Sequence, residues 1–127
     1  KTDITALMEV TEENAPCISN SGRVDLTCLE TNLFRLEKFY PKGTGNFVPR
    51  FIRELRTCGI ALCDYKIFEY IKRLRPLTRE REFTDAPVRK LMLEERGLLG
   101  YRLPGIVFDI GNPKGYRQCL TFIKKHP

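Results

Sequence analysis

The sequence has no tryptophan and a single histidine, His126. Its five cysteines include no Cys-x-x-Cys pair, and no apolar run approaches the ~20 residues that span a bilayer. A zinc centre needs clustered cysteine and histidine ligands, so this scarcity argues against one. An odd number of unpaired cysteines favours free thiols in a reducing compartment. We therefore expect no membrane span and a cytoplasmic location, and no signal peptide at Lys1, because no apolar segment with a small-residue cleavage site follows it.

What the chain does contain is an ordinary globular composition. Its 127 residues are 42% hydrophobic and 30% charged, with a net charge of +6. This length is enough for one domain with a core, and we expect a single domain over residues 1–127. A basic surface attracts phosphorylated ligands or nucleic acid, but this charge is also ordinary for a soluble protein. Because the sequence has no long basic run, we do not expect nucleic-acid binding.

Hydrophobic spacing predicts mainly strands in the first half of the chain. Alternation favours strands over Ile4–Val10 and Leu33–Tyr40. Residues 17–20 and 23–29 are interpreted as a hairpin around Asn20-Ser21-Gly22. Residues 41–46 form a loop rich in glycine and proline. Phe47–Leu55 is ambiguous and includes the spacing of a short helix.

The second half is predicted to alternate strands and helices. A strand over Thr57–Leu62 precedes a helix over Tyr65–Leu74, and a second helix begins at Thr84 or Asp85 and ends at Gly97. A hairpin is expected across Pro104-Gly105, between strands 99–103 and 106–109. The last helix, 113–125, is expected to bury Tyr116, Cys119, Leu120 and Ile123. This order predicts an α/β or α+β fold with a mixed sheet and flanking helices.

The segment Phe108-Asp109-Ile110-Gly111-Asn112-Pro113 is interpreted as a buried strand that ends on a carboxylate before a helix. Asn112 can cap that helix, and Pro113 suits its first position. Open α/β sheets place ligand chemistry at such strand ends, so Asp109 is a candidate metal-site or phosphate-site carboxylate. The alternative is that Asp109 only closes the turn.

Several segments in a fixed order resemble a known family. They are Thr57–Leu62, the helix after it, Thr84-Asp85-Ala86, Gly100-Tyr101 and Phe108–Tyr116. This order is similar to the C-terminal part of the sugar-1-phosphate nucleotidylyltransferases, and within them to the bacterial UTP–glucose-1-phosphate uridylyltransferases. The resemblance is good from about Thr57 to the end and looser before it.

The resemblance implies four site residues. Asp109 matches the second of two aspartates that hold Mg²⁺ in a complete site. Glu37 and Lys38 match a Glu-Lys-Pro segment in which the glutamate accepts sugar hydroxyls and the lysine meets the sugar phosphate, although proline stands two positions late, at Pro41. Gly59 matches a glycine near the sugar. The alternatives are that Glu37 and Lys38 are only exposed charges on an edge strand, and that Gly59 serves only packing.

Departures from the family pattern limit what the resemblance implies. The glycine-rich Gly-x-Gly-Thr-Arg loop that binds the nucleotide has no convincing counterpart, since Gly43-Thr44-Gly45 lacks the arginine. Pro16-Cys17 stands where the family has Tyr-Gly beside the sugar. We therefore expect an incomplete nucleotidylyltransferase that binds sugar phosphate and Mg²⁺ but is inactive alone.

The alternative function is a non-catalytic oligomerising module derived from that family. The missing half of the sheet would leave an open edge, which favours a homo-oligomer or a second chain that carries the missing half. Ile4–Val10 is the strand we expect at that edge.

Overall fold

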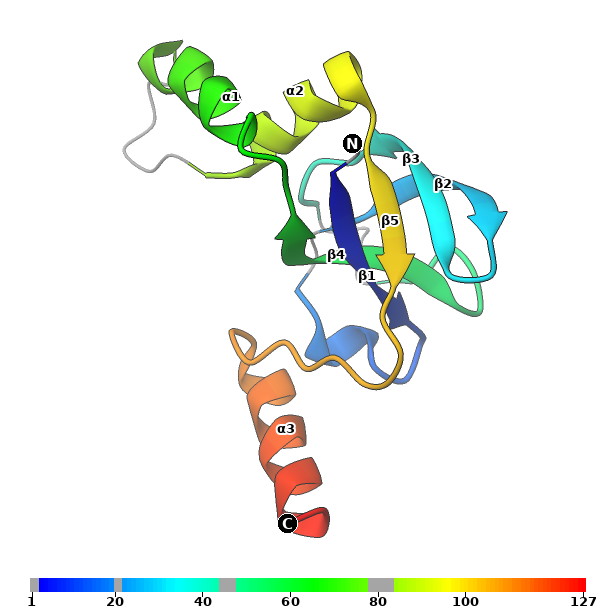
Figure 1. Ribbon diagram of the computed structural model, residues 1–127. Coiled ribbons are helices and arrows are strands. Elements are labelled where there is room, and N and C mark those ends of the chain that lie inside the picture. Colours follow the sequence, from blue (N-terminus) through cyan, green and yellow to red (C-terminus); the bar gives the residue numbers. More distant parts are fainter. Residues whose placement is uncertain (1–2, 20–21, 44–47, 78–83) are drawn as a thin grey trace.

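A mixed five-stranded sheet organises the chain. The computed structural model describes residues 3–19, 22–43, 48–77 and 84–127. The strands are β1 (Ile4–Val10), β2 (Val24–Glu30), β3 (Leu33–Phe39), β4 (Glu54–Leu62) and β5 (Leu99–Arg102). Their order is β2-β3-β5-β1-β4, and β1 runs parallel to β5 while the other neighbours are antiparallel (Figure 1). The prediction of a mixed sheet with flanking helices is confirmed.

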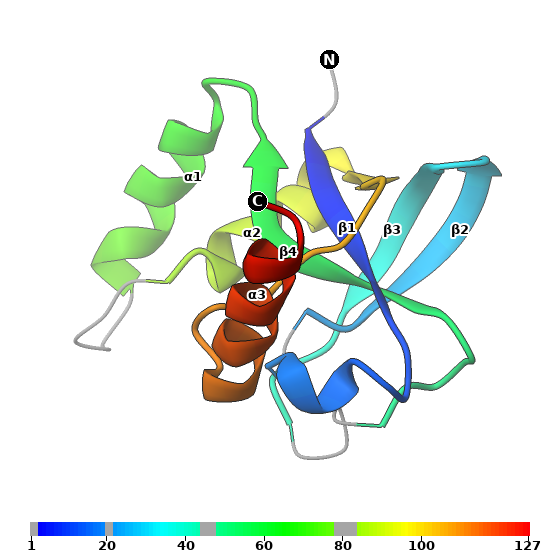
Figure 2. The same ribbon diagram turned by 90° about the horizontal axis from the view of Figure 1, so that it is seen from below.

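The helices lie in two separate places. The short helix η1 (Ala15–Cys17) follows β1, and α1 (Ile67–Leu74), η3 (Arg75–Leu77) and α2 (Ala86–Arg96) lie between β4 and β5 in the chain. Helices α1 and α2 pack together, and α2 also contacts β3. Helix α3 (Pro113–Lys125) contacts η1 and extends away from the sheet. The β2–β3 hairpin lies on the side of the sheet remote from α1 in both views (Figures 1 and 2).

Strand β1 pairs with β5 on one edge and β4 on the other, and its two faces pack into separate clusters. Leu7 packs into one cluster, which includes residues of α1 and α2, whereas Met8 and Val10 pack into another with Ala15. The prediction that Ile4–Val10 is an exposed edge is therefore wrong. Parallel pairing with β5, which comes about ninety residues later in the chain, buries it, and β2 and β4 are the edge strands.

Three predicted elements differ in the structure. Cys17 ends η1 instead of starting a strand, and the hairpin is β2–β3; Asn20 and Ser21 lie outside the described residues. The spacing of a helix before Leu55 is misleading, because Glu54 already begins β4. Residues 106–109 form no strand: the Leu103 amide donates to Leu7 O, and the chain then leaves the sheet.

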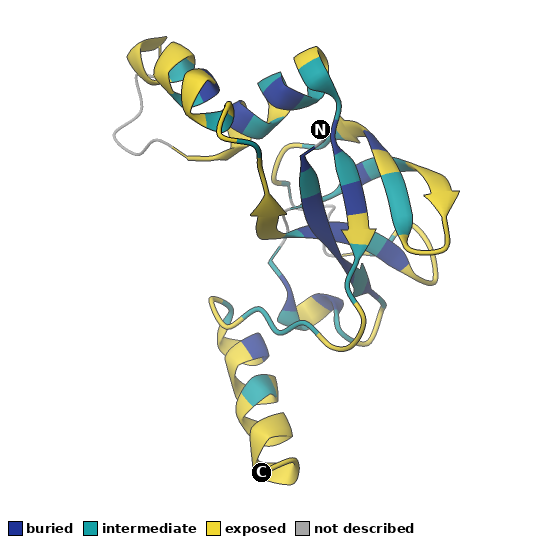
Figure 3. Ribbon diagram, viewed as in Figure 1, coloured by how far each residue is buried: buried dark blue, intermediate teal, exposed yellow. Residues whose placement is uncertain are grey.

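Helix α3 begins as predicted but is not buried as predicted. Asn112 Oδ1 accepts hydrogen bonds from the amides of Lys114 (2.9 Å) and Gly115 (3.4 Å), and Pro113 opens the helix. Figure 3 shows the helix largely exposed. Tyr116, Leu120 and Ile123 are 50%, 38% and 55% exposed, and Cys119 is half-buried. An amphipathic helix has an apolar face that usually packs against another surface. Among the described residues, little packs against this face of α3.

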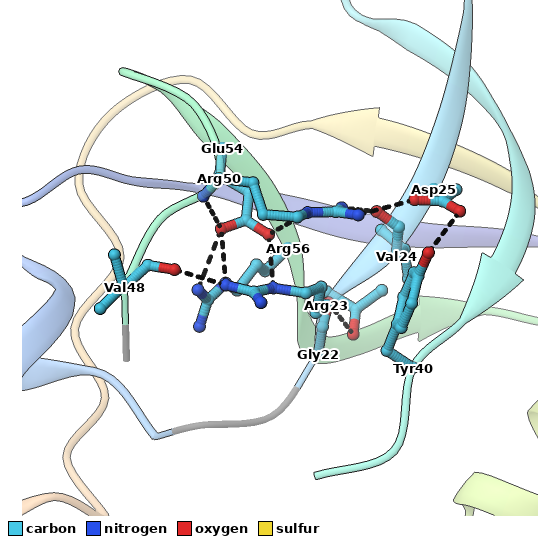
Figure 4. A network of polar contacts seen from close by, with 10 residues as sticks. Gly22, Arg23, Val24, Asp25, Tyr40, Val48, Arg50, Glu54 and Arg56 are labelled. Atoms are coloured by element: carbon cyan, nitrogen blue, oxygen red, sulfur yellow. Dashed lines mark hydrogen bonds and ion pairs between the residues drawn. The ribbon is translucent and has the colours of Figure 1, made fainter. Parts of the chain in front are cut away.

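A buried network of charges joins the first residues of β2 and β4 (Figure 4). The Glu54 carboxylate accepts hydrogen bonds from Arg23 Nε (2.9 Å), Arg50 Nε (3.2 Å) and Arg56 Nη2 (2.9 Å). The side chains of Glu54 and Arg56 are each 1% exposed. Burial pushes the pKa of Glu54 upward, but the hydrogen bond and charge of Arg56, together with the hydrogen bonds from Arg50 and Arg23, outweigh it, so the pKa lies below its ordinary value.

The network continues outward through Arg50. Its Nη1 donates to Asp25 Oδ1 at 2.8 Å, and Tyr40 Oη donates to Asp25 Oδ2 at 2.8 Å. The hydrogen bond from Arg50, followed by that from Tyr40, holds the pKa of Asp25 below its usual range. These ion pairs fix the start of β4 against β2, and β4 carries one wall of the cleft described next.

Candidate functional site

A cleft of about 360 Å³ lies where β4, the start of α2 and the 107–111 loop meet. Met8 of β1 and Thr57, Cys58 and Gly59 of β4 form one part of its wall. Asp85 and Arg89 enter from α2, and Val107 to Gly111 close it from the side of α3. The cleft therefore brings together segments that lie about fifty residues apart in the sequence.

Asp109 faces this cleft and also closes a turn. Its Oδ2 accepts the amide of Ser19 at 2.8 Å, and its Oδ1 accepts the amide of Gly111 at 3.1 Å. The side chain is half-buried and lines the cleft. Each carboxylate oxygen has a second lone pair, so these backbone contacts orient the group without exhausting its capacity to accept. The two interpretations of Asp109 are thus compatible.

Gly59 lines the same cleft. Its φ of +79° lies in the left-handed region, and a Cβ built there would meet nothing within 4 Å. Packing therefore does not explain the glycine, whereas its backbone conformation does. The bare backbone faces open space, where a ligand can approach closely.

Glu37 and Lys38 do not reach this cleft. Both line a separate pocket of about 440 Å³ between β3 and α2, together with Lys90 and Gly97. Glu37 Oε1 accepts hydrogen bonds from Arg35 Nε (2.7 Å) and Thr27 Oγ1 (2.8 Å). These bonds, chiefly the one from Arg35, lower the pKa of the Glu37 carboxyl. Lys38 Nζ lies 4.6 Å from the centre of the Tyr40 ring. The structure thus places Asp109 with Gly59 and separates both from Glu37 and Lys38.

The sequence reasoning missed two side chains in the cleft. Cys58 lines it with its Sγ 3.6 Å from Ala6 O, and burial raises the pKa of its thiol. Arg89 lines it from α2, with its Nε 3.0 Å from Asp85 Oδ2. Asp85 and Arg89 are four residues apart, and this helical spacing was the signal available in the sequence.

The acidic residues of the cleft fit a cation only when a ligand helps to hold it. No group of three or more histidine, cysteine, aspartate or glutamate side chains is arranged to hold a metal among the described residues. Mg²⁺ is usually bound by one or two carboxylates together with substrate phosphates. Asp109 satisfies that pattern if a phosphorylated ligand occupies the cleft. Gly43-Thr44-Gly45, the candidate nucleotide loop, lies largely outside the described residues, because Thr44 and Gly45 are not described.

Comparisons with known proteins find relatives at the level of structure. No family model matches the sequence, and no curated protein matches it. A solved apo UDP-glucose pyrophosphorylase superposes with a TM-score of 0.74 over 99% of this chain and 44% of that chain, at 20% identity. The fold is that of the UDP-glucose pyrophosphorylases. A UDP-glucose complex matches at a TM-score of 0.74 and 21% identity, covering 98% of this chain and 45% of that chain.

The UTP-bound enzyme of Acinetobacter baumannii has a TM-score of 0.68 and 17% identity, over 99% of this chain and 41% of that chain. The chain therefore spans less than half the length of the pyrophosphorylases it matches. UDP-glucose pyrophosphorylase is another name for UTP–glucose-1-phosphate uridylyltransferase, so the resemblance drawn from the sequence is confirmed at the level of the fold. Within the described ranges, no helix is long and apolar enough to cross a membrane.

Proposed function

We propose that this chain forms the sugar-phosphate-binding part of a nucleotidylyltransferase of the UTP–glucose-1-phosphate uridylyltransferase type. One observation carries the proposal: Asp109 and Gly59, both assigned from the resemblance, line one cleft of a pyrophosphorylase fold. The neighbours with that fold include structures complexed with UDP-glucose and with UTP. A half-buried carboxylate beside bare backbone suits a sugar phosphate that arrives with a cation.

The chemistry of nucleotidylyl transfer assigns roles to these residues. An oxygen of the sugar 1-phosphate attacks the α-phosphate of the nucleotide, and pyrophosphate leaves. Mg²⁺, when bound, offsets the negative charge that builds up at the reacting phosphorus. Asp109 would hold that ion, and the amides of Ser19 and Gly111 keep its carboxylate aimed at the cleft. Gly59 would let the β4 backbone approach the sugar.

We propose further that these 127 residues bind without turning over. The Gly-x-Gly-Thr-Arg loop expected to bind the nucleotide has no convincing counterpart in the sequence. Backbone amides of such loops neutralise phosphates, and the cleft offers little in their place. Catalysis would then require the nucleotide-binding part from elsewhere.

Calorimetric titration with glucose 1-phosphate tests the proposal, with and without Mg²⁺. We expect Mg²⁺ to strengthen binding by the original chain and to add little to binding by Asp109→Asn. Asp64→Asn is the matched control, because Asp64 Oδ1 also accepts a local amide, that of Lys66, but lies outside the cleft. Thermal melts show whether Asp109→Asn remains folded. If Mg²⁺ strengthened binding equally in the original chain and in both variants, the role of Asp109 would be contradicted. If the original chain turned over glucose 1-phosphate with UTP and Asp109→Asn did not, the proposal that the site is incomplete would be contradicted.

A second candidate function is the oligomerising module, which the exposed apolar residues favour. Ile60 and Leu62 of the edge strand β4 are exposed, as are Leu120 and Ile123 of α3. Exposed apolar surface beside an unpaired strand edge commonly pairs with another chain. Sedimentation velocity should show self-association that Leu120→Glu with Ile123→Glu weakens. A monomer at high concentration would count against this function.

A further inference from the structure

Arg89 is an arginine held in the cleft wall with few partners. It lies in the first turn of α2, and its side chain is 20% exposed. The guanidinium carbon lies 5.6 Å from the centre of the Phe39 ring, which restricts the side chain. Among the described residues, its ion-pair partner is Asp85, whose side chain is 69% exposed. A partner exposed to this degree contributes little.

The hydrogen-bond donors of Arg89 are available to a ligand. Its buried Nε lies 3.0 Å from Asp85 Oδ2 but finds no hydrogen bond among the described residues. Its Nη groups also find no acceptor there, and they are not buried away from water. A guanidinium carries five N–H donors in a fixed fork. The fork of Arg89 can therefore turn its Nη donors toward an anion in the cleft.

The positive charge of Arg89 extends across the cleft to β4. Burial raises the pKa of the Cys58 thiol, and the charge of Arg89 partly offsets this rise by favouring the thiolate. Burial also raises the pKa of Cys63, which follows β4, and the charge of Arg89 again acts in the opposite direction. Among the described residues that line the cleft, Arg89 is the sole cationic side chain. An anion in the cleft would therefore meet its favourable charge here.

We infer that Arg89 binds the phosphate group of the ligand that occupies this cleft. This is the role that the family resemblance assigned to Lys38, which the structure places in another pocket. A guanidinium binds phosphate through two parallel hydrogen bonds, and one already fixed by packing loses less entropy when it does so. The inference deepens the proposed function and rests on it for the identity of the ligand.

Titration of the 127-residue chain with three probes tests this inference: glucose 1-phosphate, inorganic phosphate and glucose. Loss of a charged hydrogen-bonding group should weaken binding of both phosphates by about tenfold or more in Arg89→Gln. Arg89→Lys, which keeps the charge but not the fork, should weaken it less. Binding of glucose, which carries no phosphate, should be the same in all these proteins.

Arg96→Gln is the matched control. Arg96 lies on the same helix, is equally buried at 19% exposed, and also has a buried donor without a hydrogen bond, Nη1, 3.5 Å from Asp3 Oδ2, but it does not line the cleft. It should bind both phosphates as the original chain does. A measurement that needs no substitution adds support: phosphate should slow alkylation of Cys58 in the cleft and leave exposed Cys28 unaffected.

The outcomes separate this inference from the proposed function. If glucose 1-phosphate binds the original chain and Arg89→Gln equally well, the role of Arg89 is overturned while the proposed function stands. If inorganic phosphate binds through Arg89 but glucose 1-phosphate does not bind, the anion site stands and the proposed function fails. If neither phosphate binds nor protects Cys58, the inference is overturned.

Discussion

Replacing Glu54 by glutamine should destabilise the protein more than any surface ion-pair substitution. Glu54 pairs with three arginines, and both it and Arg56 are 1% exposed. Glutamine keeps the shape but leaves the buried Arg56 charge without a carboxylate. Removal of one partner from a buried ion pair costs about 3–5 kcal/mol in free energy of unfolding. With a urea dependence of about 2 kcal/mol per molar, the unfolding midpoint should fall by about 2 M.

The matched control is Glu95→Gln, on the surface of α2. Glu95 also accepts two hydrogen bonds from one arginine, at 2.7 and 2.9 Å from Arg73, but these side chains are 39% and 54% exposed. Exposed pairs contribute under about 1 kcal/mol. Urea unfolding followed by circular dichroism should therefore separate the two variants clearly. Equal midpoints for Glu54→Gln and Glu95→Gln would refute the reasoning.

Acid provides an independent readout of the same group. Because the folded-state pKa of Glu54 is lowered, its contribution is complete above the unfolded-state value of about 4.3 and is lost as pH falls through the folded value. The original chain should thus lose free energy of unfolding below about pH 4.3. In Glu54→Gln this part of the loss should be absent, so its profile in acid should be flatter.

Two further predictions concern glycines at close contacts. In Gly100→Ala the new Cβ would lie 2.6 Å from Leu7 Cδ1 within the central strand, so overpacking should cost about 1–3 kcal/mol in urea unfolding; an unchanged midpoint would show that Leu7 moves freely. In Gly115→Ala the new Cβ would overlap the backbone oxygen of Asp109 and lie 2.6 Å from Cys17 O. Amide exchange should therefore rise at the start of α3 while that of β1 stays slow, and equal protection of α3 in both proteins would contradict this.

Local patterns predicted the elements whose causes are local. Alternation identified Ile4–Val10 and Leu33–Tyr40, observed as Leu33–Phe39, because a strand places every second residue on the same face. It did not reveal that β1 is buried on both faces. The cap at Asn112 was also predictable, since its side chain satisfies amides only two and three residues later. Asp109 was proposed from its place before the capped helix and from the order of motifs, and Gly59 from that order alone; no local pattern revealed that they share a cleft.

The errors arose where distant contacts decide the structure. Val107 and Phe108 are apolar enough for a strand, but the chain leaves the sheet after the Leu103–Leu7 hydrogen bond, and Val107 packs against the cluster of Met8 and Val10 instead. The apolar stripe of α3 led to the wrong prediction that this helix is buried, because little among the described residues packs against it. Arg89 was overlooked because its four-residue spacing from Asp85 shows only that the two share a helix face, and not that the face lines a cleft.

The central place of β5 has a consequence for how the protein emerges from the ribosome. Leu99–Arg102 is the last of the described strands in chain order, yet it joins the β2–β3 hairpin to the β1–β4 pair. Until it leaves the exit tunnel, the nascent chain holds two sheet fragments that lack their shared neighbour. Pairing over such long sequence separations is slow, and unpaired edges invite aggregation meanwhile. We expect the sheet to close only after β5 has emerged, and the domain to benefit from chaperones until then.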